Sequence, residues 1–542
     1  MQVKLNIKNI ITIIENQKNN FNTWLFGFFG IVLLRFFIEI FLDNIPIKEG
    51  FIYLVFFVND FLLVMFVYSV FLIFLMFLIK KEFNKSKNFL FYGVWLILLP
   101  PIIDKIIFKE GIYKNFYLFD SAKGLIERFF LFYGDSLNWG ITIGGRVLVF
   151  LSVFLLSCYY FQKKRKILKT VGFAFLVYFI FFILNSLPSL ITFGLEFIKN
   201  GNILNVSKTT VVGYFMSPLS IFGINNNEIE TFLAKKMSII YYLMIFVNIN
   251  LIYFLKNKKK YIVLIRNVRL PQVFFNLGLL FLGLALGFLN YNENFQFNFF
   301  NISSVLVLCI VVFCSWVSSV LVNDISDLVV DKISNSSRPL ITKKITIKEY
   351  KKINIIIALF SIVGAFLIKP LFVVFVSLYY CLTWFYSCSP FRFKRILIIS
   401  NILIAFSSLL FLVMGFIVFS GSETLEFFPW KIYWFLFFAY FFIIPLKDLK
   451  DLEGDQKDKI YNLVVLVGRK KTRLIIASFL FSFYLLSVYI LHEQELFLSA
   501  LFFGILNFII VSGDKIGEKK INSWVLGLVF IYSLWIIKVI FL

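Results

Sequence analysis

The chain has 542 residues, of which 60% are hydrophobic and 20% aromatic. A soluble domain is closer to half apolar and could not bury this many apolar side chains, so the composition excludes a soluble globular protein. The formal charge of +24 is carried by lysines and arginines that gather in short loops. That pattern is typical of cytoplasmic loops facing anionic lipid, and it argues against a nucleic-acid partner.

Long apolar runs predict the elements of the fold, because ~20 apolar residues are enough for a helix to cross a bilayer. Six such runs precede residue 258 and about nine follow it, so we predict an all-α, polytopic membrane protein. Pro370 leaves open whether 353–369 and 371–387 are one kinked helix or two. The predicted spans lie near 24–43, 53–79, 89–108, 141–161, 170–197, 238–255, 270–289, 302–322, 353–369, 371–387, 397–419, 430–446, 474–491, 496–512 and 523–541.

Loop charge predicts the orientation of these spans. Alternate loops are basic, whereas the loops 290–298, 420–428 and 492–495 on the opposite side are neutral or acidic. Because cytoplasmic loops carry the excess of lysine and arginine, we expect a multi-pass protein with its N-terminus in the cytoplasm and its C-terminus outside. The basic loops contain 81–88, 163–169, 256–269, 338–352, 392–395, 447–473 and 514–520.

The lysine-rich segment 256–260 is the clearest boundary in the chain. We therefore expect an N-terminal transmembrane domain over 1–258 and a second domain over 259–542. The first resembles no known family, and it carries charges in or near its spans, among them Arg35 and Asp60. An ion pair between these two, or charges reaching the helix ends, is the plain interpretation. A module that delivers or receives a lipid substrate is the alternative.

Two acidic clusters with one spacing stand at the ends of predicted spans. The first lies in NDISDLVVD, residues 323–331, and the second in KDLKDLEGD, residues 447–455. Each holds three aspartates at positions i, i+3 and i+7, which fall within roughly 60° of one another on a helix. These are Asp324, Asp327 and Asp331, beside Asn323, and then Asp448, Asp451 and Asp455. The loop charges place both clusters on the cytoplasmic side.

Three carboxylates on one helix face repel one another, and near a bilayer each is costly unless it is neutralised. Mg²⁺ is the simplest neutralising ion, because it takes oxygen ligands from carboxylates and from substrate phosphates together. Two such faces opposite each other would hold metal ions over a diphosphate and stabilise its charge as it leaves. Two ordinary solvated helix ends would not require the same spacing twice.

Over residues ~260–542 the chain resembles the UbiA superfamily of intramembrane prenyltransferases. NDISDLVVDKISNSSRPL (323–340) and KDLKDLEGDQKDK (447–459) are similar to the family's two aspartate-rich motifs. The stretch from Tyr386 to Arg395 is similar to the family's loop after the fourth helix. The family has nine transmembrane helices, which equals the number of spans expected here.

The resemblance implies Mg²⁺ as cofactor, a prenyl diphosphate as donor and a hydrophobic or amphipathic acceptor at the bilayer. The aspartates and the asparagine of the two motifs would hold metal, and Asp324 or Asp448 could also take the final proton. The residues that would contact diphosphate are Arg338, Arg392, Lys394 and Lys447, and Tyr386 belongs to the same loop as two of them.

The chain departs from the family pattern after the second motif. Many relatives have a glycine there, then a basic residue and Thr-Leu-Pro, where this chain has Lys459, Tyr461, Asn462 and Val464. The departure leaves the metal site intact and makes the acceptor harder to assign. The motifs are similar to those of family branches that act on lipid-phosphate or aromatic acceptors, and this resemblance implies an acceptor of one of these two kinds. A terpene cyclase of the same superfamily is one alternative, and a cation-coupled transporter is another, although transporters place such carboxylates near mid-membrane.

Overall fold

In the structure, a computed structural model, all regular secondary structure among the described residues is helical, apart from one isolated bridge between Ile396 and Tyr461. The fold class predicted from the sequence is therefore confirmed. The described residues are 7–43, 50–79, 83–108, 121–134, 141–203, 206–217, 229–291, 293, 297–420, 425–513 and 517–541.

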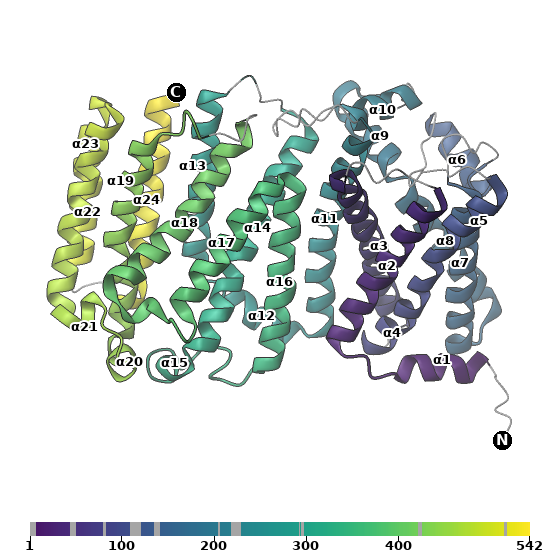
Figure 1. The fold of residues 1–542 in the computed structure, drawn as a ribbon, viewed down its shortest axis with the longest axis horizontal. Coiled ribbons are helices and arrows are strands. Elements are labelled where there is room, and N and C mark those ends of the chain that lie inside the picture. The colour runs from purple at the N-terminus through teal and green to yellow at the C-terminus, as the bar shows by residue number, and fades with distance from the viewer. Residues whose placement is uncertain are drawn as a thin grey trace. The chain divides into compact units, whose positions relative to one another are not determined.

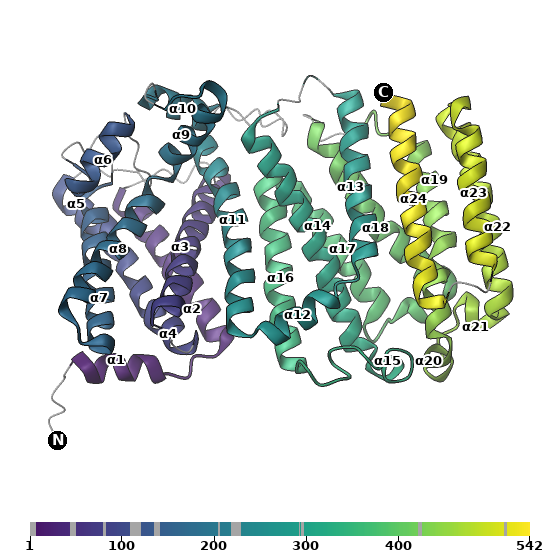
Figure 2. The same cartoon turned by 180° about the vertical axis from the view of Figure 1, so that it is seen from behind.

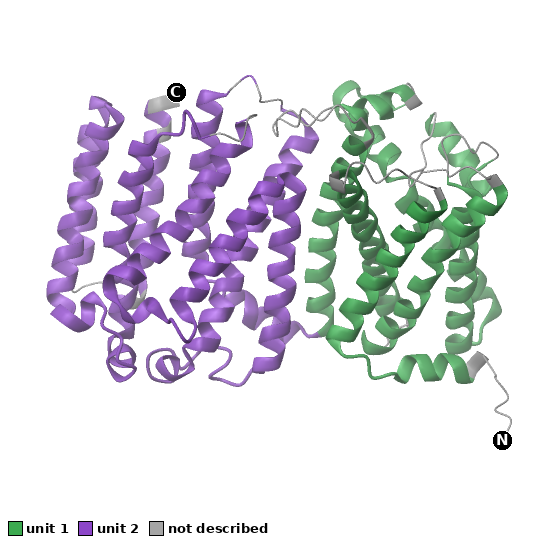
Figure 3. Ribbon diagram, viewed as in Figure 1, with its two compact units in different colours: residues 1–218, 226–256 green, residues 219–225, 257–542 purple. Residues whose placement is uncertain are grey.

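The chain divides into two compact units (Figure 3). Unit 1 contains residues 1–218 and 226–256, and unit 2 contains residues 219–225 and 257–542. Fourteen described helical segments are long and apolar enough to cross a membrane, and Lys520–Ile536 forms a shorter apolar segment.

Unit 1 has six of these segments, as the apolar runs predicted. The predicted span 170–197 is instead two helices that meet at Ser186, because Pro188 stands in the first turn of the second and cannot continue the first. The helices are α1 (Ile7–Asn16), α2 (Phe21–Asp43), α3 (Gly50–Ile79), α4 (Phe83–Gly93), η1 (Val94–Leu98), α5 (Leu99–Phe108), α6 (Ala122–Phe130), α7 (Ile143–Lys164), α8 (Ile167–Asn185), α9 (Leu187–Asn200), α10 (Lys208–Met216) and α11 (Ile229–Lys256).

Charged side chains in unit 1 are held by local partners. Arg35 forms an ion pair with Glu39, one turn further along α2, at 2.8 Å, and Asp60, the partner suggested by the sequence, also interacts with it electrostatically. Helix α1 lies across the ends of the upright helices (Figures 1 and 2). It is fixed there by Glu15, which accepts hydrogen bonds from Tyr159 Oη and Lys163 Nζ, both at 2.8 Å.

Unit 2 holds eight of the long segments and the shorter segment of α24, which gives the nine spans predicted for the described part of this unit. Lys369 is extended, with φ −148° and ψ 136°, so Pro370 starts a new helix rather than a kink. The helices are α12 (Lys258–Arg266), α13 (Leu270–Asn290), α14 (Phe299–Ser326), α15 (Leu328–Ser334), α16 (Ile347–Ile368), α17 (Pro370–Ser387), η4 (Phe393–Arg395), α18 (Leu397–Phe419), α19 (Trp430–Ile443), η5 (Ile444–Asp451), α20 (Leu452–Lys457), α21 (Leu463–Val467), α22 (Arg469–Leu491), η6 (Gln494–Leu496), α23 (Phe497–Ser512) and α24 (Glu518–Phe541).

Helices α13 and α18 make the closest backbone contact in the centre of unit 2, and glycines permit it. A Cβ added at Gly283 would lie 2.0 Å from the carbonyl oxygen of Leu412, and one added at Gly415 would lie 2.3 Å from that of Leu280. Small residues allow membrane helices to approach until their backbones touch, and the resulting van der Waals contact holds them together. Sixteen of the 23 residues of α18 are buried, among them all of residues 407–419.

Replacing Gly283 with Ala should therefore force α13 away from α18. We expect a loss of about 1–3 kcal/mol in unfolding free energy, as for other overpacked sites. Thermal unfolding of the detergent-solubilised chain measures it. The matched control is Gly278→Ala on the same helix, because a Cβ there meets nothing within 4 Å. Equal melting temperatures for the two variants would contradict this account of the packing.

Candidate active site

Both aspartate motifs lie where a helix breaks. In the first motif α14 ends at Ser326, and α15 starts at Leu328. In the second motif η5 ends at Asp451, and α20 starts at Leu452. The break falls on the middle aspartate each time, at Asp327 with φ −101° and at Asp451 with φ −101°. Neither motif is thus the single helical face that the spacing suggested.

The two motifs meet at one end of unit 2, where α15 packs against α20 (Figures 1 and 2). Gly454 makes the approach possible, since a Cβ there would lie 2.6 Å from Ser334 Oγ and 3.0 Å from the carbonyl oxygen of Val330. Asn335 joins the motifs directly. Its Nδ2 donates to Asp331 Oδ1 at 3.2 Å and to Asp451 Oδ1 at 2.9 Å.

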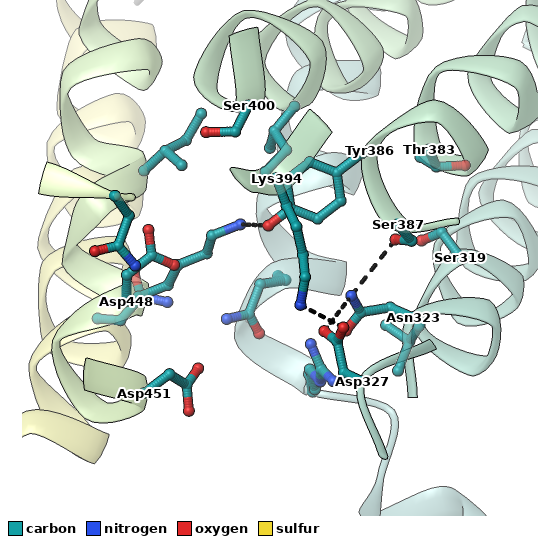
Figure 4. A pocket seen from close by; sticks show the side chains of 18 of the residues that line it. Ser319, Asn323, Asp327, Thr383, Tyr386, Ser387, Lys394, Ser400, Asp448 and Asp451 are labelled. Atoms are coloured by element: carbon teal, nitrogen blue, oxygen red, sulfur yellow. Dashed lines mark hydrogen bonds and ion pairs between the residues drawn. The ribbon is translucent and has the colours of Figure 1, made fainter. Parts of the chain in front are cut away.

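One cavity collects side chains from both motifs. Figure 4 shows Asp448 and Asp451 on one side and Asn323 and Asp327 on the other, with Lys394 between them. Asp331 and Asp455 also line the cavity, as do Arg338, Lys447 and Tyr386. Of the residues that the sequence singled out, Asp324 and Arg392 are not in the lining. Each contacts a residue that does line the cavity: Asp324 contacts Arg338, and Arg392 contacts Asp327.

Basic side chains neutralise the first motif. Arg338 Nη1 lies 2.5 Å from Asp324 Oδ1 and 2.6 Å from Asp331 Oδ2. Lys394 Nζ donates to Asp327 Oδ1, and Arg392 lies 3.3 Å from the same oxygen. Every aspartate of this motif therefore has a cationic partner.

The second motif has amide partners instead of cations. Asp451 accepts from Asn335, and Asp455 Oδ2 accepts from Asn462 Nδ2 at 2.7 Å. Among the residues that the structure describes, none of the three aspartates of this motif forms an ion pair within 4.0 Å. Lys447 precedes Asp448 in the chain, but its Nζ donates to Tyr386 Oη at 3.0 Å. Among the described residues, the carboxylates of the second motif thus have no cationic side chain in direct contact, unlike those of the first.

Several residues of the site were not predicted from the sequence. Arg269 reads as one more basic loop residue, yet its Nη2 lies 2.8 Å from Asp324 Oδ1. Asn335 stands four residues after Asp331, a helical spacing that could have pointed to it. Asp458 follows the second motif and lies 2.5 Å from Arg392 Nη2. One departure from the family pattern can be followed in the structure. Lys459 stands where many relatives have a glycine, and it adopts a left-handed φ of 54°, a conformation that favours glycine.

The residues present suit a hard divalent cation. The lining holds six acidic side chains and five basic ones among the described residues, a net negative charge before any anion binds. All ligands on offer are oxygens, as Mg²⁺ prefers. Burial raises the pKa of Asp331 to about 7, even though the neighbouring Arg338 lowers it, so ionising that carboxyl calls for further positive charge. In the described part of the chain no three acidic, histidine or cysteine groups already converge as a metal cage. Mg²⁺ does not need such a cage, since it shares its ligands with phosphate and water.

Gly454→Ala should separate the two motifs, because the new methyl group collides with α15. We expect the affinity for Mn²⁺, measured by electron paramagnetic resonance on the detergent-solubilised chain, to fall ~10-fold or more, as when the outer residues of a metal site are disturbed. Gly527→Ala is the matched control, since its Cβ meets nothing within 4 Å. Unchanged Mn²⁺ binding in Gly454→Ala would show that the contact of α15 and α20 does not shape the site.

Comparison with known proteins agrees with these motifs. The sequence model of the UbiA prenyltransferase family matches residues 273–535. A digeranylgeranylglyceryl phosphate synthase from Methanococcus maripaludis strain C6 is 27% identical over 191 residues, which cover 35% of this chain and 65% of the relative, just under two thirds of its length. The enzyme of the same name from strain S2 is 28% identical over 228 residues, covering 40% of this chain and 72% of the relative.

A solved structure has also been compared with the chain. It is that of a UbiA homologue from Archaeoglobus fulgidus bound to DMAPP and Mg²⁺, and it is 19% identical with a TM-score of 0.39. It covers 51% of this chain and 99% of that one. The family match and the two aspartate motifs together establish that residues 273–535 of this chain belong to the UbiA prenyltransferase family.

Proposed function

We propose that unit 2 transfers a prenyl group from a prenyl diphosphate to an isoprenoid glyceryl phosphate within the membrane. One observation carries the proposal: five aspartates from the two motifs line the same cavity as five basic side chains. A prenyl diphosphate needs both kinds of group, since its phosphates bind cations directly and bind carboxylates only through metal.

Mg²⁺ held by Asn323, Asp327 and Asp331 on one side and by Asp448, Asp451 and Asp455 on the other would neutralise the diphosphate and the charge that develops as its carbon–oxygen bond breaks. The basic residues of the lining act on the same group. Arg338 and Lys394 contact carboxylates of the first motif. We infer that both also donate to the diphosphate when it enters, because a phosphate oxygen offers them the same charge-assisted hydrogen bond as a carboxylate does.

The rest of the cavity suits the prenyl chain. Phe275, Trp316, Ile404 and Leu526 line it and offer apolar surface. Tyr379, Tyr440 and Tyr386 line it as well, and aromatic faces stabilise a nearby carbocation. Ionisation of the allylic carbon would thus occur next to rings rather than next to water.

The acceptor must lose a proton as it attacks the allylic carbon. Of the two carboxylates that the sequence singled out for this role, Asp448 lines the cavity and Asp324 does not. This favours Asp448 as the proton acceptor. The cavity lining thus has a proton acceptor, Asp448, next in the chain to a proton donor, Lys447, whose Nζ donates a hydrogen bond to Tyr386 Oη.

The acceptor class rests on the lining and on the relatives. Hydroxyl groups also line the cavity, and they suit the polar oxygens of a glycerol unit better than a flat aromatic ring. They belong to Ser319, Thr383, Ser400, Ser407 and Ser408. The relatives named digeranylgeranylglyceryl phosphate synthase favour the same acceptor. The basic loops near the motifs favour a cytoplasmic active site.

Membranes containing the full chain should consume radiolabelled geranylgeranyl diphosphate only when Mg²⁺ and an isoprenoid glyceryl phosphate are both present. Asp327→Ala and Asp451→Ala should each reduce turnover by ~10²-fold or more, because each leaves transition-state charge without its counterion. The matched control is Glu495→Ala, an exposed acidic residue far from both motifs in sequence. Turnover that persists in the two aspartate variants would refute the proposal, and consumption of donor without acceptor would identify a cyclase instead.

We further propose that the chemistry needs residues 257–542 alone, whereas unit 1 delivers or receives the lipid substrate. All described residues of the cavity lie in unit 2. A chain that starts at residue 257 should therefore keep the kcat of the full chain when donor and acceptor are supplied in detergent micelles. With substrates in liposomes, by contrast, the full chain should turn over faster than the truncated chain, because only the full chain has unit 1. A truncated chain that folds, judged by its thermal transition, but has no turnover in micelles would assign unit 1 a part in catalysis.

A further inference from the structure

Asp324 differs from the other aspartates in where its side chain lies. Asp324 and Asp331 are both almost fully buried, at 1% and 2% exposure, but Asp324 does not line the cavity and Asp331 does. The other five aspartates of the two motifs all line it. A residue that binds a soluble ion must present an oxygen to the space that the ion occupies, and Asp324 presents none.

Both oxygens of Asp324 are fully engaged by protein groups. Oδ1 accepts from Arg269 Nη2 at 2.8 Å and from Arg338 Nη1 at 2.5 Å. Oδ2 accepts from Asn267 Nδ2 at 2.7 Å and from Tyr350 Oη at 3.2 Å. An ionised carboxylate has about four lone-pair sites, so these four donors satisfy it completely. Binding a metal through Asp324 would cost some of these buried hydrogen bonds.

The two arginines come from separate parts of the fold. Arg269 precedes α13 and adopts a left-handed φ of 59°, and Arg338 lies in the loop after α15. Both line the cavity. The side chain of Asp324 is the one group that contacts both guanidinium groups in the described part of the site. It therefore fixes the distance between them.

We propose that Asp324 is a positioning residue, which holds Arg269 and Arg338 as a pair of guanidinium groups facing the donor's diphosphate. The inference deepens the proposed function and rests on it for the identity of the anion. Guanidinium groups bind phosphate oxygens through two parallel N–H bonds, and this requires a fixed orientation of each plane. Buried Asp324 supplies that orientation from behind, and Asn267 and Tyr350 hold Asp324 itself.

The test is Asp324→Asn in the full chain, compared with Asp451→Asn, which changes a cavity-lining carboxylate. Two probes are used without any turnover: Mn²⁺, followed by electron paramagnetic resonance, and inorganic diphosphate, followed by calorimetry with Mn²⁺ present. We expect Asp324→Asn to leave Mn²⁺ affinity within ~2-fold and to weaken diphosphate at least ~10-fold, as expected for losing a buried charged partner of two arginines. Asp451→Asn should weaken Mn²⁺ itself. If Asp324→Asn lowers Mn²⁺ affinity as much as Asp451→Asn does, the positioning role is wrong.

Arg269→Lys provides a second route if Asp324→Asn does not fold. It keeps the positive charge and removes the two-pronged geometry, so diphosphate should again weaken while Mn²⁺ binding stays unchanged. Arg266→Lys is the matched control, because it makes the same substitution at an exposed arginine at the end of α12 that does not line the cavity. Diphosphate affinity equal to wild type in Arg269→Lys would overturn the proposal. If wild type binds both probes but transfers no prenyl group, the proposed function fails while the arginine pair stands.

Discussion

Charge neutralisation near the membrane is the constraint on which the rest of unit 2 depends. Six acidic and five basic side chains line one cavity at the end of a bundle of apolar helices. Carboxylates so close to hydrocarbon are costly unless each has a partner. The fold provides these partners from segments far apart in the chain: Lys394 between α17 and α18, Arg338 after α15, and Asn462 before α21. Helix packing within unit 2 is arranged so that these segments meet.

The neutralisation is uneven, and the unevenness has chemical meaning. The first motif is compensated by guanidinium and ammonium groups, whereas the described partners of the second motif are amides. An amide hydrogen bond stabilises a carboxylate without removing its negative charge. The second motif thus offers carboxylates that no described cation contacts directly, which suits a divalent cation, and the first motif holds basic groups that suit an anion. The substrate and its metal have opposite charges, so a cavity with both kinds of wall can receive them together.

Breaks in the helices place these groups. The chain leaves helical geometry at Asp327 and again at Asp451, and the short helices α15 and α20 that follow pack against each other through Gly454. Arg392, with a left-handed φ of 42°, holds both Asp327 and Asp458. The loop that carries it also pairs with the strand-like segment at Tyr461. These contacts connect three segments of unit 2 beside the site: the end of α14, the loop after α17 and the loop after α20.

The sequence by itself determined the all-α membrane fold, the number of spans and the two aspartate motifs, because each of these is written in local periodicity and composition. Spans follow from runs of apolar residues, and the motifs follow from a repeated spacing of carboxylates. Only the tertiary structure decided that Asp324 lies behind the cavity and that Arg269 and Asn335 belong to the site. Spacing along a helix cannot show which carboxylate is covered by another segment. Packing between distant segments decides that, and it depends on contacts such as Gly454 against Val330 that no local pattern contains.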